Sequence, residues 1–409
     1  MKCILHIGTH KTGSTAIQSA LSTYDDGRSF YAQLGNANHS VPLYTAFSEN
    51  FLDYHIWKKQ GAREHEIREK RHLALRDLQQ QLARRSREQI ILSGEDISLL
   101  SENEALSLLD LIRTHCDDII VIAYVRDPLS FAASSFQEFV QGGMGTIPEM
   151  MSPRYRFRLE KFENNLGKDK LIVKCYSPAS LMDGDIVKDF CATVGLDSGQ
   201  MTRSHINESV SVHSLKAMYL LNRTNPLQYG DMKLIECRLQ LLHILKRVFK
   251  DDAKLNRYRF EKLADYTECA WLKKEFNIEF PGTEEQKEPI PSLQEWLNDF
   301  PADATEKLID FLHANGIKEN FGMDTVKIIN RIYYLTLEGG KLIGDGLELT
   351  FKHLMDNDVN MLRDLALKYE SGKLVSKDDA LALMTLALRG RPHGTLIKQK
   401  VFEWGSVKE

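Results

Sequence analysis

Residues Lys2–Thr15 read KCILHIGTHKTGST and place an apolar run directly before a turn rich in Gly, Ser and Thr. The run Lys2–Ile7 is typical of a short buried strand, and the spacing of Ile17 and Leu21 predicts that a helix follows the turn. A glycine turn between a strand and a helix gathers main-chain N–H groups at the positive end of the helix dipole. The turn Gly8–Thr15 therefore predicts a phosphate-binding loop.

Strand and helix patterns alternate beyond this turn. The run Asp118–Tyr124 (DIIVIAY) is continuously apolar, as in strands buried within parallel sheets. The alternation predicts an α/β fold, with a P-loop-like parallel sheet flanked by helices. The further predicted strands are Ser29–Leu34, Gln89–Ser93 and Lys170–Tyr176, and the predicted helices include Glu64–Arg87, Asn103–Thr114 and Pro128–Val140.

The chain of 409 residues is too long for one ordinary core. Helical patterns dominate from about Asn207 onward, interrupted by Ile278–Asp303, which holds four prolines (Pro281, Pro289, Pro291 and Pro301) and the acidic run Glu284–Glu288. We predict an α/β domain over 1–281, a Pro-rich linker over 282–302 and an all-α domain over 303–409.

The segment Leu362–Pro392 resembles one tetratricopeptide repeat at six positions: Ala366, Tyr369, Gly372, Ala380, Ala387 and Pro392. A single repeat cannot bury its own apolar face. Either the segment Val326–Asp356 supplies further packing helices, or the pair docks on the α/β domain. Two roles stay open for these C-terminal helices, a platform for a protein partner or a glycan and a cap that completes the core.

Composition and charge narrow the function classes. Lys+Arg total 53 and Asp+Glu total 57, so the formal net charge of −4 provides no global basic field for nucleic acid. No apolar run approaches the ~18 residues that a transmembrane segment needs. The N-terminus lacks the pattern of a secretory signal, and six scattered cysteines predict reduced thiols, so we expect a cytoplasmic protein. No metal-ligand spacing stands out, and we predict a site without a metal.

The turn Gly8–Thr15 differs from the nucleotide-triphosphatase P-loop, G-x-x-x-x-G-K-[ST], at one informative position. Gly8, Gly13 and Thr15 fit that pattern, but Ser14 stands where the lysine belongs. Lys11 lies inside the loop, three residues earlier. The loop therefore suits a phosphate, with the lysine approaching from a different place than in a kinase or NTPase.

The loop His10–Thr15 (HKTGST) resembles the 5′-phosphosulfate loop of sulfotransferases that use 3′-phosphoadenosine 5′-phosphosulfate (PAPS). A second segment resembles the 3′-phosphate site of the same family: Tyr124–Pro128 (YVRDP) ends a strand, and Ser134 follows Arg126 by eight residues in the next predicted helix. The resemblance covers roughly residues 1–280. It is strongest to the bacterial and Golgi carbohydrate-type members.

This resemblance implies transfer of a sulfuryl group from PAPS to a hydroxyl of a carbohydrate or glycolipid in a bacterial cytoplasm, with adenosine 3′,5′-bisphosphate as product. Lys11 would stabilise charge on the bridging oxygen of the leaving group. Arg126 and Ser134 would bind the 3′-phosphate. The implied residues of the 5′-phosphosulfate loop are His10, Lys11, Thr12, Gly13, Ser14 and Thr15.

Two residues are candidates for the base that takes the acceptor's proton. Glu95 follows the predicted strand Gln89–Ser93, where related carbohydrate sulfotransferases carry their base. His39 follows the second predicted strand. Glu95 could instead only start a helix, where a carboxylate is favourable, and His39 could be an ordinary loop residue.

Two other groups of residues have two interpretations each. The stretch Asn207–Ser211 resembles a late segment of bacterial members that could close over the nucleotide, or it caps the helix that follows. Seven aromatic residues could stack on a sugar or belong to the core: Tyr24, Phe30, Tyr31, Tyr44, Phe47, Tyr54 and Trp57.

Two rival functions for the protein remain, a P-loop kinase or NTPase and a non-catalytic nucleotide-binding scaffold.

Overall fold

The computed structural model describes the chain except for residues 85, 202–209, 228–229, 254, 281–291, 316, 318–321, 338–339, 344–345, 350–355, 373–375 and 406–409. The chain forms two compact units. The first contains Met1–Ser135, Pro148–Glu208 and Arg257–Pro289, and the second contains Phe136–Ile147, Ser209–Asn256 and Ile290–Glu409.

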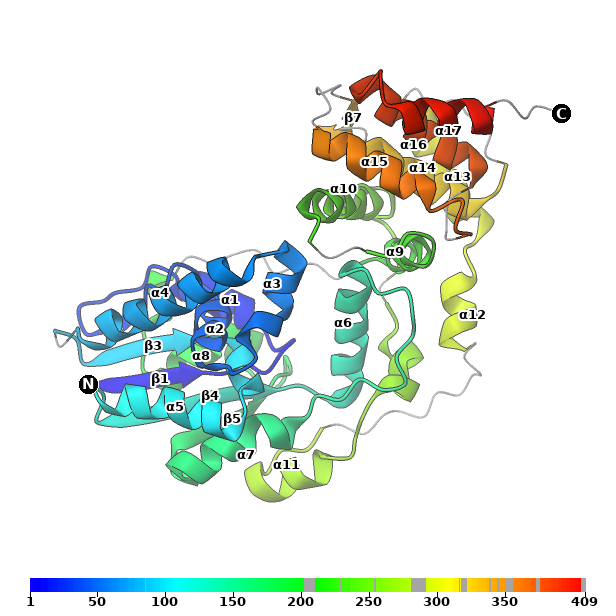
Figure 1. The fold of residues 1–409 in the computed structure, drawn as a ribbon. Coiled ribbons are helices and arrows are strands. Elements are labelled where there is room, and N and C mark those ends of the chain that lie inside the picture. Colours follow the sequence, from blue (N-terminus) through cyan, green and yellow to red (C-terminus); the bar gives the residue numbers. More distant parts are fainter. Residues whose placement is uncertain are drawn as a thin grey trace. The chain divides into compact units, whose positions relative to one another are not determined.

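A parallel sheet with the strand order β2-β3-β1-β4-β5 forms the centre of the first unit (Figure 1). Every neighbouring pair in this sheet is parallel. The predicted α/β fold with a parallel sheet is therefore confirmed. The strands are β1 (Lys2–His6), β2 (Ser29–Tyr31), β3 (Gln89–Ser93), β4 (Asp118–Val125) and β5 (Leu171–Cys175).

Helices cover both faces of this sheet, because successive side chains of a buried strand point to opposite faces. Cys3 and Leu5 join the core shared with α2, α4, α5, α7 and α11, whereas Ile4 joins the core shared with α1 and α8. The bounds of these helices are α1 Ser14–Leu21, α2 Ser40–Phe47, α4 Glu64–Leu82, α5 Glu102–Arg113, α7 Tyr155–Leu166, α8 Ile186–Val194 and α11 Cys269–Phe276.

The seven aromatic residues between the glycine loop and the long helix α4 belong to the core. Tyr44 is partly buried, and the other six are buried. Tyr54 and Trp57, the latter in the short helix α3 (His55–Gln60), form a small cluster with Phe51. The six buried side chains offer no open sugar-stacking face, and Tyr44 stacks on Tyr54.

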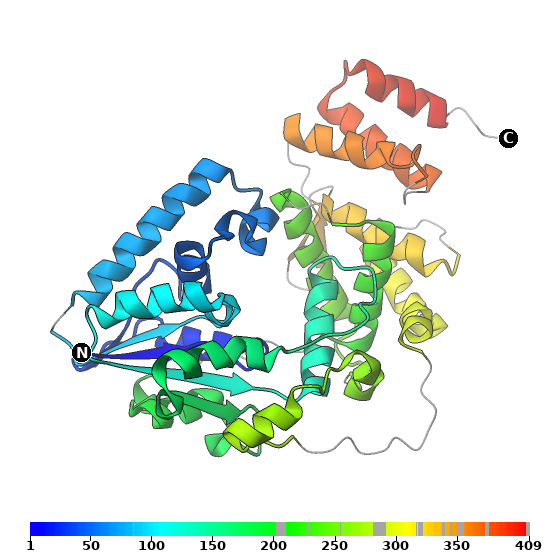
Figure 2. The same cartoon turned by 60° about the horizontal axis from the view of Figure 1, so that its bottom comes forward.

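The second unit is mainly helical, as the C-terminal pattern predicts. Helix α10 packs on α9 and α14, and the last three helices pack in sequence, α15 on α16 and α16 on α17 (Figure 2, orange to red). Its helices are α9 Val212–Thr224, α10 Met232–Val248, α12 Leu293–Asn298, α13 Ala302–Ala314, α14 Thr325–Leu337, α15 Asp356–Leu367, α16 Lys377–Gly390 and α17 Thr395–Gly405, and α6 (Pro128–Gln141) is shared by both units.

The structure differs from the expected organisation in three places. The helical unit includes 136–147 and 209–256, which the sequence assigns to the first domain. Residues 293–298 of the expected linker form α12, because Ser292 and Glu295 make a capping box. An antiparallel pair of strands, β6 (Gly340–Ile343) and β7 (Gly346–Leu349), lies in a region expected to be all helical.

The stretch Asn207–Ser211 is described only in part, since Asn207 and Ser209 lie outside the described residues. The capping interpretation is confirmed for Ser211, whose side chain accepts a hydrogen bond from the Ser214 N–H at the start of α9. Within the described ranges, no helix combines the length and the apolar character that crossing a membrane requires.

Candidate active site

The predicted site residues lie at the carboxyl edge of the sheet. Strand β1 lies between β3 and β4, although β2 follows it in sequence, so the direction of strand addition changes at β1. In open α/β sheets, ligands bind in the crevice at such a switch point. Four segments leave the strands at this edge: the loop Gly8–Gly13 after β1, Glu95 after β3, Arg126 after β4 and Tyr176 after β5.

The loop after β1 has a tightly specified backbone. Gly8, Lys11 and Gly13 all have positive φ, at 82°, 63° and 80°. A Cβ added at Gly8 would lie 2.8 Å from the Cβ of Glu95, so only glycine fits there. The Thr9 N–H donates to the Tyr124 carbonyl (2.8 Å), and the Thr12 hydroxyl donates to the Thr9 carbonyl (2.5 Å). The loop is therefore held in shape by β4 and by its own side chains.

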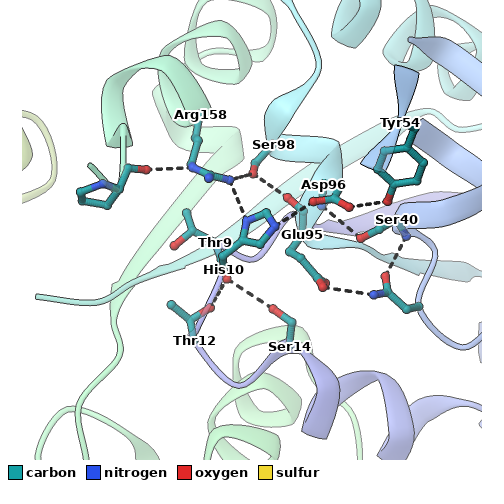
Figure 3. Close-up of polar contacts among 12 residues, drawn as sticks. Thr9, His10, Thr12, Ser14, Ser40, Tyr54, Glu95, Asp96, Ser98 and Arg158 are labelled. Carbon is teal, nitrogen blue, oxygen red and sulfur yellow. Dashed lines mark hydrogen bonds and ion pairs between the residues drawn. The ribbon is translucent and has the colours of Figure 1, made fainter. Parts of the chain in front are cut away.

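The other predicted loop residues take different positions. His10 is partly exposed and lies between Arg158 and Asp96 (Figure 3). Ser14 is buried and Thr15 is exposed in the first turn of α1. The Thr12 hydroxyl is used within the loop, so a phosphate here would meet mainly main-chain N–H groups and Lys11.

Arg126 joins the end of β4 to the loop after β1. Its guanidinium donates to the Lys11 carbonyl at 3.1 Å, across 115 residues of sequence, and lies 5.7 Å from the centre of the Tyr176 ring. Burial lowers the pKa of Arg126, but an arginine still carries its charge at neutral pH. The structure thus places the Arg126 guanidinium against the main chain of the loop that carries Lys11.

A second guanidinium lies at the N-terminus of α6. Arg257 donates to the Ser130 hydroxyl at 2.9 Å and lies 3.9 Å from a carboxylate oxygen of Asp127. Asp127 also accepts from the Ser130 N–H at 2.9 Å. Ser134, half-buried, lies one turn further along the helix. No local sequence pattern marks Arg257 as a site residue, because it belongs to a 3₁₀ helix (Arg257–Leu263) about 130 residues along the chain from the start of α6.

A cavity of about 400 Å³ opens beside the loop. Gly13 and Ala16 border it from the start of α1, and Tyr176 borders it from the end of β5. Its other walls include apolar side chains such as Leu181 and Ile186. A cavity of this size and character suits a flat ring system held next to the loop.

Glu95 begins a 3₁₀ turn (Glu95–Leu99) directly against the loop. One carboxylate oxygen accepts from the Gln18 amide at 3.0 Å, and the other accepts from the Asn38 amide at 3.1 Å. The side chain is only half-buried. Two neutral donors therefore orient a carboxylate that solvent still reaches.

His39 is a structural residue, which corrects the expectation that it rivals Glu95. Its side chain is fully buried at 0% exposure and stacks on Tyr31. The Ser93 N–H donates to Nδ1 at 3.0 Å, so Nε2, 2.9 Å from the Ala32 carbonyl, carries the hydrogen and donates it. Both ring nitrogens are used inside the core, and neither can reach a substrate.

Because two histidines are buried, we expect the protein to lose stability in mild acid. Burial lowers the pKa of His39 to about 4 and that of His6 to about 3. Both groups titrate near 6.5 when unfolded, so the unfolded chain binds protons first and stability falls as the pH drops below that value. We expect a loss of about 2 kcal/mol for each ring by pH 5, measured by urea unfolding at pH 7 and pH 5.

His65→Gln is the matched control for this prediction, because His65 is exposed on α4. The free energy of unfolding of His65→Gln should depend on pH in the same way as that of the unchanged protein. A free energy of unfolding that stays constant between pH 7 and pH 5 would contradict the assignment of His6 and His39 as neutral core residues.

No family model matches the chain, and neither the curated proteins nor the solved structures contain a significant match.

Proposed function

We propose that the protein is a PAPS-dependent sulfotransferase. The hydrogen bond from Arg126 to the Lys11 carbonyl carries this proposal, because it joins the two segments that resemble the 5′-phosphosulfate and 3′-phosphate sites. A nucleotide with charged groups at both ends needs cations at two points of one site, and Lys11 and Arg126 both follow strands that end at this edge of the sheet. The residues at this edge support the proposal more than the fold does, because one fold can host many functions.

The residues suit the two ends of such a nucleotide. Lys11 and the N-terminus of α1 would hold the 5′-phosphosulfate. Arg126 and Ser134 would hold the 3′-phosphate, and we add Arg257 to this group because it contacts Ser130, one turn before Ser134 in the same helix. The cavity beside Gly13 and Tyr176 would take the base.

The reaction follows from these positions. Glu95 would accept the proton of the acceptor hydroxyl as its oxygen bonds to sulfur. The bond from sulfur to the bridging oxygen breaks, and that oxygen leaves as part of the 5′-phosphate of adenosine 3′,5′-bisphosphate. Lys11 would stabilise the charge that develops there, and preorganised donors of this type contribute about 10²–10³ in rate.

The acceptor class is proposed from the family resemblance. We propose that the acceptor is a hydroxyl of a carbohydrate or glycolipid in a bacterial cytoplasm.

For the C-terminal helices α15 to α17 we propose two roles, a platform for a partner or glycan and a structural cap. Deletion of 303–409, followed by solubility and turnover assays, separates these roles.

Calorimetry with three nucleotides tests the proposed function directly. Adenosine 3′,5′-bisphosphate should bind more tightly than AMP or ATP, because only it carries phosphate at both ends of the site. Tighter binding of ATP together with Mg²⁺-dependent hydrolysis would favour the kinase or NTPase alternative. Binding of the bisphosphate without any transfer of labelled sulfate to cell-envelope extracts would favour the scaffold.

Glu95→Gln tests the proposed base. We expect turnover to fall by about 10²–10⁴, with binding of adenosine 3′,5′-bisphosphate nearly unchanged, because Gln keeps the size of the side chain but cannot take the proton. Initial rates and calorimetry measure the two effects separately. Glu88→Gln is the control, since Glu88 is exposed at the opposite edge of the sheet. Near-full turnover in Glu95→Gln would mean that another group is the base.

A further inference from the structure

A chain of polar side chains contacts the loop through His10 (Figure 3). Arg158, from α7, is buried and donates from Nε to the Pro153 carbonyl at 2.8 Å. One of its terminal nitrogens lies 2.7 Å from the Ser98 hydroxyl and 2.9 Å from Nδ1 of His10. Nε2 of His10 lies 2.8 Å from a carboxylate oxygen of Asp96.

These contacts define which nitrogen of His10 holds the hydrogen. A guanidinium only donates, so Nδ1 of His10 must accept from Arg158 and carry no hydrogen. Nε2 then holds the hydrogen and lies 2.8 Å from Oδ1 of Asp96. The ring is thus a neutral connector between a donor and an acceptor, and its orientation is set at both nitrogens.

The two groups that flank the His10 ring, Asp96 and Arg158, are both buried and both charged. Asp96 is 4% exposed, and its other oxygen accepts from the Tyr54 hydroxyl, while its N–H donates to the Ser40 hydroxyl at 3.1 Å. Burial disfavours the charged carboxylate, but hydrogen bonds from His10 and Tyr54 hold the pKa of Asp96 below its usual range. Burial lowers the pKa of Arg158 to about 10, which leaves it charged at neutral pH.

His10 therefore bridges a buried cation and a buried anion, each costly to leave without a partner. The bridge also connects three segments: α7 through Arg158, the turn after β3 through Asp96, and the loop itself. Lys11 is the next residue in the chain, so a fixed His10 ring limits where the Lys11 main chain can lie.

We propose that His10 is a positioning residue, a neutral imidazole held between Asp96 and Arg158 that fixes the loop so that Lys11 meets the leaving group. The part of this inference that concerns catalysis rests on the proposed sulfotransferase function. The part that concerns the ring and the loop does not, because it follows from contacts within the protein.

Three variants and four measurements test this proposal. His10→Ala removes the bridge, His10→Gln keeps one donor and one acceptor in a neutral side chain, and His65→Ala is the exposed control. The measurements are ¹⁵N spectra of the imidazole rings at pH 7.5, hydrogen exchange of the peptide that covers 8–15, and kinetics with PAPS beside calorimetry with adenosine 3′,5′-bisphosphate.

We expect a hydrogen on Nε2 and none on Nδ1 of His10. His10→Ala should exchange faster over 8–15 and lose about 100-fold in turnover, as misplacement by about 1 Å does in other sites, while its affinity for the bisphosphate changes less than threefold. His10→Gln should recover most of both losses. A doubly protonated ring, unchanged exchange in His10→Ala, or equal losses in both variants would overturn the proposal.

The outcomes also separate this proposal from the proposed function. If the unchanged protein neither binds the bisphosphate nor transfers sulfate, the sulfotransferase proposal fails. The ring spectra and the loop exchange would still decide whether His10 positions the loop. If the unchanged protein is active but His10→Ala exchanges and turns over normally, only the positioning proposal fails.

Discussion

Lys11→Ala is expected to lose about 10²–10³ in turnover and to bind adenosine 3′,5′-bisphosphate with nearly unchanged affinity. The lysine would act on charge that develops only as the sulfur–oxygen bond breaks, so its removal affects the transition state more than the bound nucleotide. Alanine also has a Cβ, so the free-energy cost of the left-handed backbone at this position, with φ of 63°, is about the same as in the unchanged protein. Rates with PAPS and calorimetry with the product measure the two effects.

Lys2→Ala is the matched control for Lys11→Ala, because Lys2 lies at the opposite end of the same strand, β1. It should leave both rate and affinity unchanged. A Lys11→Ala variant that loses affinity for the product as strongly as it loses turnover would show that the lysine holds the ground state, and the proposed role in the transition state would be wrong.

The sequence predicts the sheet well because buried parallel strands are marked locally. Ile90–Leu92 and Ile119–Tyr124 are apolar throughout, and the structure places β3 and β4 there, with β4 extending one residue past the predicted end at Tyr124. The strands β6 and β7 are missed because each has only four residues in a region of helical patterns. Short strands carry too few residues for a periodicity to be recognised.

The site is predictable only in part, for a related reason. Lys11 and Arg126 each follow a strand, and strands of one parallel sheet end at one edge, so their meeting follows from the fold. His39 also follows a strand, but its partners are the main chains of residues 32 and 93, which tertiary packing supplies. Arg158 and Arg257 come from helical segments far along the chain, and no local pattern marks them as site residues.

Arg126→Ala is expected to weaken binding of adenosine 3′,5′-bisphosphate by about 2 kcal/mol or more, roughly thirtyfold in Kd. The guanidinium is partly buried, so its interaction with a phosphate is poorly screened by water. It also holds the Lys11 carbonyl, so turnover should fall as well. Calorimetry with the bisphosphate and with AMP separates these effects, since AMP lacks the 3′-phosphate.

Comparing the affinities for adenosine 3′,5′-bisphosphate and AMP decides which end of the nucleotide Arg126 binds. In Arg126→Ala, affinity for the bisphosphate should fall close to that for AMP, so discrimination between the two nucleotides is lost. Lys11→Ala should keep that discrimination, because its role lies at the 5′ end. Arg257→Ala should weaken bisphosphate binding in the same sense but less, because Arg257 is more exposed and its charge is better screened. Equal losses for both nucleotides in Arg126→Ala would mean that its guanidinium supports the loop and does not bind the 3′-phosphate.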